Sequence, residues 1–140
     1  MRVRNWDTAL IAWAEGAVGA PFVWGETDCA MLCFCAYDIL TGAALAAQYE
    51  GMWSSEATAK RFILAHKLDL QGALERAGCR PVQRNFQQRG DLILVRGAGW
   101  MSGHVCLGEN SLSSRTESGV GWVRTAELLA AKSCLILRAP

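Results

Sequence analysis

Three of the chain's six cysteines, Cys29, Cys33 and Cys35, fall within one short stretch, PFVWGETDCAMLCFCAYDIL. The reactive form of cysteine is the thiolate, and a helix N-terminus stabilises an anion through its unpaired N–H groups and its dipole. If Thr27 or Asp28 caps the helix that follows, Cys29 lies in the first turn, where a thiol pKa is lowered. Cys33 and Cys35 lie deeper in an apolar helix, where a thiol stays protonated. The sequence therefore predicts Cys29 as a nucleophile.

A nucleophilic thiol needs a base, and the chain has two histidines, His66 and His104. His66 falls in the amphipathic stretch AKRFILAHKL, which favours a solvated surface histidine. His104 opens the apolar segment HVCLGE after Gly103, and a turn at this glycine would let the ring reach a neighbouring helix end. We therefore expect the fold to bring Cys29 and His104 together as nucleophile and base.

Two other interpretations of these residues stay open. Cys29 and Cys33 share a helix face, and His104 and Cys106 share a strand face, so the four could in principle form a tetrahedral zinc site. The chain has no Cys-x-x-Cys, however, and Cys106 suits an apolar strand, so we expect neither a metal nor another cofactor. The remaining interpretation is structural, because free cysteine is among the most buried residue types and a histidine can simply be hydrogen-bonded at a strand end.

Length and composition limit the kind of protein. The chain has 140 residues, of which 51% are hydrophobic and six are tryptophan, so we expect one ordered domain over residues 1–140. The net charge is +1 without a basic stripe, which argues against a nucleic-acid partner. The opening MRVRNWDTALIAW is interrupted by Asp7, so we expect neither a signal peptide nor membrane insertion, and we expect synthesis in a reducing cytoplasm with free thiols.

The pattern along the chain predicts helices first and strands later. Apolar spacing and capping residues (Asn5 or Asp7, Ser54 or Ser55, and Gly78) indicate helices over 5–18, 29–40, 43–51 and 54–78. The second of these helices is apolar nearly all round and is expected to end at Thr41-Gly42. Short segments rich in branched residues indicate strands over 79–86, 90–96, 104–109, 119–124 and 134–139, with a short helical turn over 125–131. This order predicts an α+β domain in which N-terminal helices pack on a C-terminal antiparallel β-sheet.

Two blocks of the sequence, in this order, resemble the NlpC family of papain-like cysteine peptidases. PFVWGETDCAMLCF is similar to the family's nucleophile segment, in which an aromatic-x-x-Gly turn leads into Asp-Cys at a helix start. RGDLILVRGAGWMSGHVCLGE is similar to its second block, with Gly-Asp before one strand and His-Val and Leu-Gly after a glycine loop. The extra helical stretch between the blocks is similar to small phage tail proteins of this family.

The resemblance implies a papain-like NlpC fold and cleavage of peptide bonds in the stem peptides of bacterial peptidoglycan. Cys29 matches the family's nucleophile and His104 its base, and the backbone N–H of Cys29 would help to hold the oxyanion. The family's third polar residue, often histidine, aligns with Ser113 or Ser114, and either serine could orient His104. Phe22 matches a tyrosine of the aromatic turn and lacks its hydroxyl.

The resemblance also suggests the setting. It implies a virion tail tip, after synthesis in the host cytoplasm, with the wall peptide and other tail-tip proteins as partners. Trp24 and Trp100 flank the two blocks and are expected to wall a substrate groove, while Asp28 is expected to cap the helix and support the site. The expected function is thus a peptidoglycan hydrolase that aids DNA entry. The alternative is a structural tail-assembly protein of the same fold whose catalytic pair is weak or inactive.

Overall fold

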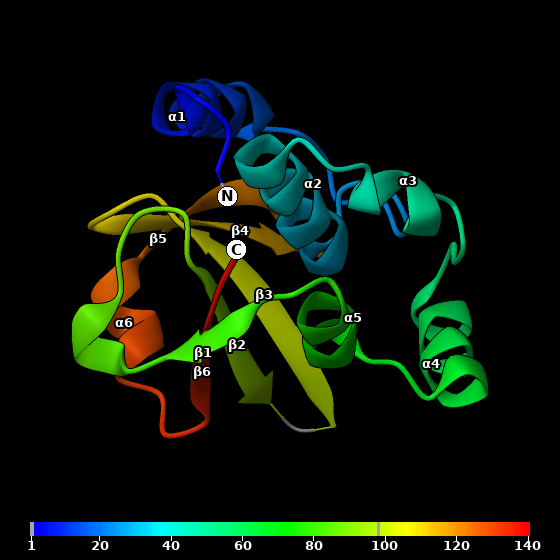
Figure 1. Ribbon diagram of the computed structural model, residues 1–140. Helices are drawn as coiled ribbons and strands as arrows, with labels where there is room; N and C mark the ends of the chain where they lie inside the picture. The colour runs from blue at the N-terminus through cyan, green and yellow to red at the C-terminus, as the bar shows by residue number, and fades with distance from the viewer. Residues whose placement is uncertain (1, 98) are drawn as a thin grey trace.

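Helices precede strands along the chain in the computed structural model, which describes residues 2–97 and 99–140 (Figure 1). The helices of the N-terminal part are α1 (Trp6–Ala17), α2 (Cys29–Thr41), α3 (Leu45–Tyr49), α4 (Glu56–His66) and α5 (Leu70–Arg76). The part that follows contains β1 (Arg80–Val82), the 3-10 turn η1 (Arg84–Phe86), β2 (Leu92–Gly97), β3 (Trp100–Cys106), β4 (Asn110–Arg115), β5 (Gly119–Arg124), α6 (Thr125–Leu129) and β6 (Cys134–Arg138). The predicted α+β class is confirmed.

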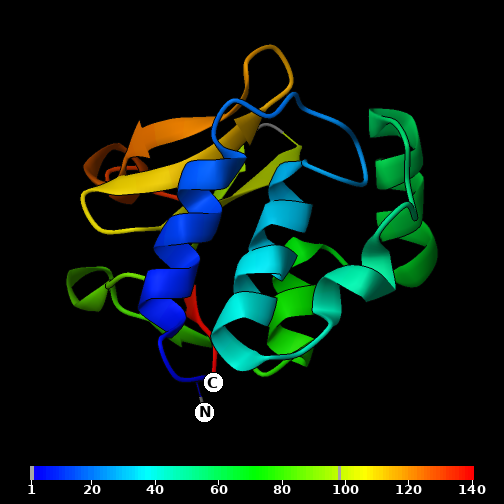
Figure 2. The same ribbon diagram turned by 90° about the horizontal axis from the view of Figure 1, so that it is seen from above.

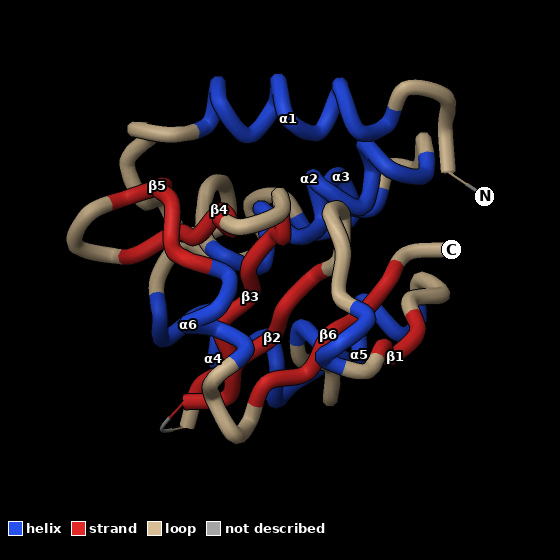
Figure 3. Tube along the Cα trace, turned by 90° about the vertical axis from the view of Figure 1, so that its left-hand side faces the viewer, coloured by secondary structure: helices blue, strands red, loops and turns tan. Residues whose placement is uncertain are grey.

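The six strands form one sheet in the order β1-β6-β2-β3-β4-β5, and every neighbouring pair is antiparallel. One face packs against the main helical layer, and Figure 3 shows α1 and α2 on the side of the sheet opposite α6. Leu92, Leu94 and Val105 belong to the core on the α2 face. Ile93 and Cys106 belong to a smaller core on the other face, which Leu128 and Leu129 of α6 help to cover. Because side chains alternate along a strand, this division decides which strand residues can meet α2.

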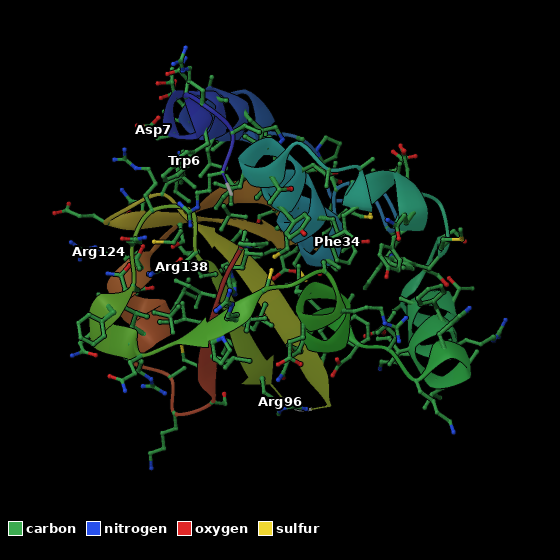
Figure 4. All side chains as sticks on the ribbon, in the orientation of Figure 1. Trp6, Asp7, Phe34, Arg96, Arg124 and Arg138 are labelled. Atoms are coloured by element: carbon green, nitrogen blue, oxygen red, sulfur yellow. The ribbon has the colours of Figure 1, made fainter. Side chains whose placement is uncertain are left out.

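Helix α2 lies at the centre of the helical layer because it is apolar on nearly every side. Met31, Leu32, Phe34 and Leu40 are among its buried residues. Gly42 ends the helix in the left-handed conformation, with φ +76°, as the sequence predicts. Figure 2 shows α1 and α2 side by side, and Figure 4 labels Phe34, whose ring stacks on Tyr49 of α3 at 4.7 Å.

The predicted helix over 54–78 is two helices. Ser55 caps α4, but Lys67 takes the left-handed conformation with φ +49° and ends that helix. Asp69 then accepts the Gly72 N–H at 2.8 Å and begins α5. An aspartate that caps a new turn competes with continuation of the old helix. The break buries Leu68, which packs in the main core.

Asp91, the residue before β2, holds β2 to β6. It is fully buried, and its two carboxylate oxygens accept hydrogen bonds from Nε and an Nη atom of Arg138 at 2.8 and 2.9 Å. The Gln88 N–H donates to the same carboxylate. A paired and hydrogen-bonded carboxylate is the form in which a buried charge is tolerated. Among the described residues no helix is both long and apolar enough to cross a membrane.

Candidate functional site

A cleft of about 470 Å³ opens where α2 begins. Its walls are mainly apolar and rich in aromatic side chains, and Cys29 lies among the lining residues together with Phe22, Trp24, Tyr49, Trp53, Phe62 and Trp100. The Trp24 ring stands edge-on to Phe22 at 4.9 Å and to Trp100 at 6.0 Å. Trp24 and Trp100, which the sequence assigns to a groove, and Phe22 of the aromatic turn therefore lie together beside the first turn of α2.

Asp28 fixes this end of the cleft. Its Oδ1 accepts the Met31 N–H at 2.9 Å, so it is the N-cap of α2, one of the two capping residues that the sequence suggests. Its Oδ2 accepts the Gly25 N–H and the Trp53 Nε1–H, each at 2.7 Å. The side chain is buried, and its oxygens are occupied by donors from three segments. Asp28 therefore positions the cleft wall.

Cys29 is the first residue of α2 and is partly exposed. Burial raises the pKa of its thiol from 9.0 to about 11, and the nearby charge of Asp28 raises this pKa further. Backbone N–H groups of Gly103 and Ala30 lower the pKa, but their effect is smaller than that of desolvation. The N-terminus of α2 thus lowers the thiol pKa as predicted, but desolvation raises it by more. At neutral pH Cys29 is a thiol and not a thiolate, contrary to the expectation from its position.

His104 lies on the other face of the sheet. Strand β3 begins at Trp100, so Gly103 is a strand residue and not a turn. A Cβ on Gly103 would point at α2 and lie 2.7 Å from the Cys33 sulfur, while Val105 belongs to the core on the same face. His104, between them in a regular ladder with β2, is directly opposite Ile93, which belongs to the core on the far face. The alternation of side chains therefore directs the His104 ring away from Cys29.

The surroundings of His104 suit a neutral ring. Its Nε2 lies 3.1 Å from the Ser102 hydroxyl, and its buried Nδ1 has no hydrogen-bond partner among the described residues. Burial, and to a lesser degree the positive charge of Arg115, lower the pKa of His104 to about 4. The second histidine, His66, is exposed as predicted, and its ring stacks on Phe62 at 4.1 Å. Neither histidine is among the described residues that line the cleft.

The two serines predicted to orient His104 lie on opposite faces of β4. Ser114 lines the cleft, and its hydroxyl donates to the Thr27 carbonyl at 2.5 Å, which ties β4 to the residues before α2. Ser113 lies on the other face and lines a polar depression beside β5. Neither serine is hydrogen-bonded to His104 within the described residues. Ser102 contacts the ring instead, and the i, i+2 spacing of Ser102 and His104 on one strand face is the signal that could have found it.

The four candidate zinc ligands do not gather. Cys29 and Cys33 lie on α2, whereas His104 and Cys106 face away from that helix. Cys106 instead donates to Gln87 Oε1 at 3.3 Å. Within residues 2–97 and 99–140, no group of three or more histidine, cysteine, aspartate or glutamate side chains could hold a metal ion.

A feature that the sequence did not reveal borders the cleft. Strands β3 and β4 pair at only two positions, Val105 with Leu112 and Cys106 with Ser111. From there the two strands diverge, β3 back to Trp100 and β4 on to Arg115, while each stays paired with its outer neighbour. Residues of both open edges line the cleft, namely Trp100, Met101, Ser102, Ser114 and Arg115. The sheet is thus split beside the N-terminus of α2.

Comparison with protein families matches residues 1–133 to the family described as Domain of unknown function (DUF6950). No curated protein matches the chain.

Proposed function

The chain belongs to the DUF6950 family, and we propose that it is a papain-like, NlpC-type domain that works by binding, as a structural component of phage tail assembly, and not by thiol catalysis. The resemblance of its two sequence blocks to the NlpC family supports this type of fold, together with an Asp-capped helix that begins at Cys29 and packs on an antiparallel sheet. The tail setting rests on the resemblance to small phage tail proteins, which would be made in the host cytoplasm and carried in the virion.

The register of β3 carries the proposal: His104 pairs with Ile93 of the far-face core, so the alternation of side chains directs it to the face opposite Cys29. A cysteine–histidine pair works when the two side chains are within hydrogen-bond reach. Here the thiol lies at the cleft, where its pKa is about 11, and the imidazole lies on the far face, where its pKa is about 4. At neutral pH both groups are uncharged, and no histidine among the described residues lines the cleft. The aromatic cleft therefore lacks the histidine that a cysteine–histidine pair needs, as far as the described residues go, which favours a binding role.

A second candidate is the peptidoglycan hydrolase that the sequence resemblance implies. It is favoured by Cys29 itself, which stands in the first turn of α2, beside the cleft, with N–H groups of Gly103 and Ala30 near its sulfur. Such donors would also suit the oxyanion of an acyl-transfer intermediate. This function would require a base other than His104 beside the Cys29 thiol.

The deciding measurement is the alkylation rate of each of the six cysteines against pH in the native protein, read by mass spectrometry. We expect Cys29 to become reactive only as the pH approaches about 11, and His104→Gln to leave its profile unchanged. His66→Gln is the matched control for removal of a histidine. Purified peptidoglycan incubated with the wild type and with Cys29→Ala should remain equally intact. Rapid labelling of Cys29 below pH 7 that His104→Gln abolishes, together with wall cleavage lost in Cys29→Ala, would overturn the proposal in favour of the hydrolase.

A further inference from the structure

The split between β3 and β4 leaves strand edges that a further strand can use. Cys106 exchanges backbone hydrogen bonds with the β2 side, because its N–H donates to the Asp91 carbonyl and its carbonyl accepts the Gly90 N–H. The next residue, Leu107, donates to the Asn110 carbonyl on the β4 side. Backbone groups of successive strand residues point to alternate sides. Val105, Gly103 and Met101 therefore direct their N–H and C=O groups toward β4.

Only the first of these three residues meets β4. Val105 pairs with Leu112, whereas Gly103 and Met101 have no partner in β4. The Gly103 backbone lies next to the Cys29 sulfur. Met101, which lines the cleft, keeps its N–H and C=O directed into the gap, and within the described residues no backbone hydrogen bond crosses from it to β4. A strand edge with free donors and acceptors is a template for an extended chain.

The side chains around this edge indicate what such a chain would carry. Trp24, Trp100 and Phe62 give the cleft a surface suited to a bulky apolar side chain. Two arginines at its rim, Arg96 and Arg115, are exposed and form no ion pair within the described residues; Figure 4 labels Arg96, at the end of β2. The exposed carboxylate of the rim is Glu117. Two further carboxylates of the lining, Asp28 and Asp69, are buried or half-buried and cap α2 and α5. Among the exposed side chains of the rim the two arginines therefore outnumber the one carboxylate, which suits a ligand carboxylate that an arginine can bind through two parallel hydrogen bonds.

We propose that an extended segment of a partner protein binds in this cleft by adding a strand to the open β3 edge at Met101. Its aromatic or large aliphatic side chain enters the aromatic cleft, and its carboxylate pairs with Arg96 and Arg115. The inference deepens the proposed binding function and rests on it. It identifies the ligand as an L-polypeptide recognised through its backbone, which separates it from a saccharide and from a wall peptide of mixed chirality.

The probe is the peptide acetyl-Ala-Phe-Ala-Glu with a free C-terminal carboxylate, titrated into the ¹⁵N-labelled full chain. Amide shifts report the position of binding and tryptophan fluorescence the affinity. We expect the Met101 amide to shift and its hydrogen exchange to slow. Methylation of each peptide nitrogen in turn should weaken binding by about tenfold at the nitrogen that pairs with Met101, since one hydrogen bond to a desolvated partner is lost. Replacing the peptide Phe by Ala should also weaken binding by about tenfold. These peptide variants leave the protein unchanged.

Protein variants test the charge and the aromatic wall. The double variant Arg96→Gln/Arg115→Gln should bind the carboxylate peptide about fivefold more weakly than the wild type does. Its affinity for a peptide in which Gln replaces Glu and the C-terminus is amidated should be unchanged. Arg80→Gln, an exposed arginine of β1 outside the cleft, is the control. Trp100→Ala should abolish binding, whereas Trp122→Ala, an exposed tryptophan of β5 outside the cleft, should not change it.

Three results would overturn the inference: shifts that avoid the cleft, equal binding of every N-methylated peptide, or a chito-oligosaccharide or wall stem peptide that shifts the Met101 amide when the L-peptide does not. Other results would distinguish failure of the proposed function from failure of this inference. If the peptide binds as described but is cleaved at a rate that Cys29→Ala abolishes, the strand-addition site stands and the non-catalytic role falls. If Cys29 proves inert and no peptide binds, the binding site falls and the absence of catalysis stands.

Discussion

The Cys29 thiol and the His104 ring titrate in opposite directions for the same reason. Burial penalises the charged form, which is the thiolate of cysteine and the imidazolium of histidine, so it raises the pKa of Cys29 to about 11 and lowers that of His104 to about 4. In a catalytic pair the two charged forms would stabilise each other. Placed on separate faces of the sheet, each residue keeps the desolvation cost without that compensation, so both remain neutral at pH 7.

His104 should make the protein sensitive to acid. Its folded-state pKa of about 4 lies below the ordinary value of 6.5, so between these values the unfolded chain binds a proton that the folded protein does not. Stability is therefore complete above about pH 6.5 and is lost as the pH falls toward 4, by about 3 kcal/mol for this shift. The measurement is the free energy of unfolding in urea at pH 7 and pH 4.5. In His104→Gln the free energy of unfolding should differ less between pH 7 and pH 4.5, by most of that amount, whereas His66→Gln should keep the full difference. An unchanged difference in His104→Gln would contradict the prediction.

Asp28 should be the most costly capping residue to remove. Asp28→Ala leaves the Met31 and Gly25 N–H groups and the buried Trp53 indole without their acceptor, and we expect a loss of about 3 to 4 kcal/mol in the free energy of unfolding. Asp69→Ala is the matched variant, because that N-cap accepts a single hydrogen bond, from Gly72, and its loss should cost about 1 kcal/mol. Urea unfolding of the two variants checks the order, and equal costs would contradict a bridging role for Asp28.

At the scale of elements, close approach of β3 to α2 depends on Gly103. A Cβ at this position would lie 2.7 Å from both the Cys33 sulfur and a Leu70 methyl, closer than side chains pack. Gly103→Ala should therefore destabilise the protein by about 2 kcal/mol through overpacking. Gly121→Ala in β5 is the matched control, because nothing lies within 4 Å of its Cβ, and its stability should be close to that of the wild type. The free energy of unfolding of both variants, and of Gly103→Ala combined with Cys33→Ala, is the measurement. Partial recovery in the double variant is expected, and equal stability of the two glycine variants would contradict the packing argument.

The sequence was informative where local signals decide the structure. The Asp28 cap, the apolar α2 and the Gly42 stop are each written in adjacent residues, and all three are found. The apolar spacing does not predict the break at Lys67, because it continues across the break, and the only local signal is Asp69, which caps α5. Caps and helix ends involve neighbours in sequence, so they can be read without the fold.

The candidate site was harder to predict because it depends on strand boundaries. A strand that begins at His104, as the sequence suggests, lets the ring turn toward α2, whereas β3 begins at Trp100, and this fixes the ring on the far face. A strand side chain changes face with every residue, so an error in where regular alternation begins can exchange the two faces. The split between β3 and β4 could not be inferred either, because it is a property of the pairing and not of either strand alone.

At the scale of the whole molecule, the sheet separates two chemical environments. The α2 face carries the aromatic cleft and the thiols of Cys29 and Cys33, while the far face carries Cys106 and the neutral His104. The residues that resemble a catalytic centre are therefore distributed across the molecule as parts of two cores. In this arrangement the folded protein favours the protonated form of the thiols, so their protonation contributes to the stability of the fold.

The cysteines should accordingly make the protein unstable in alkali. Burial raises the pKa of both Cys29 and Cys79 from 9.0 to about 11, so between these values the unfolded chain has lost protons that the folded protein retains. Their stabilising effect is complete below about pH 9 and is lost as the pH rises toward 11, by about 2 to 3 kcal/mol for each thiol. Urea unfolding under reducing conditions at pH 8 and pH 10.5 measures this loss. In Cys79→Ala the free energy of unfolding should fall less between pH 8 and pH 10.5 than it does in the wild type. Cys134→Ala should have a smaller effect on this fall, because Cys134 is more exposed. If the loss of stability at high pH is the same in the wild type, Cys29→Ala and Cys79→Ala, the buried thiols are not its source. That result would also contradict the raised pKa of Cys29, and with it the argument that Cys29 is a neutral thiol at the cleft.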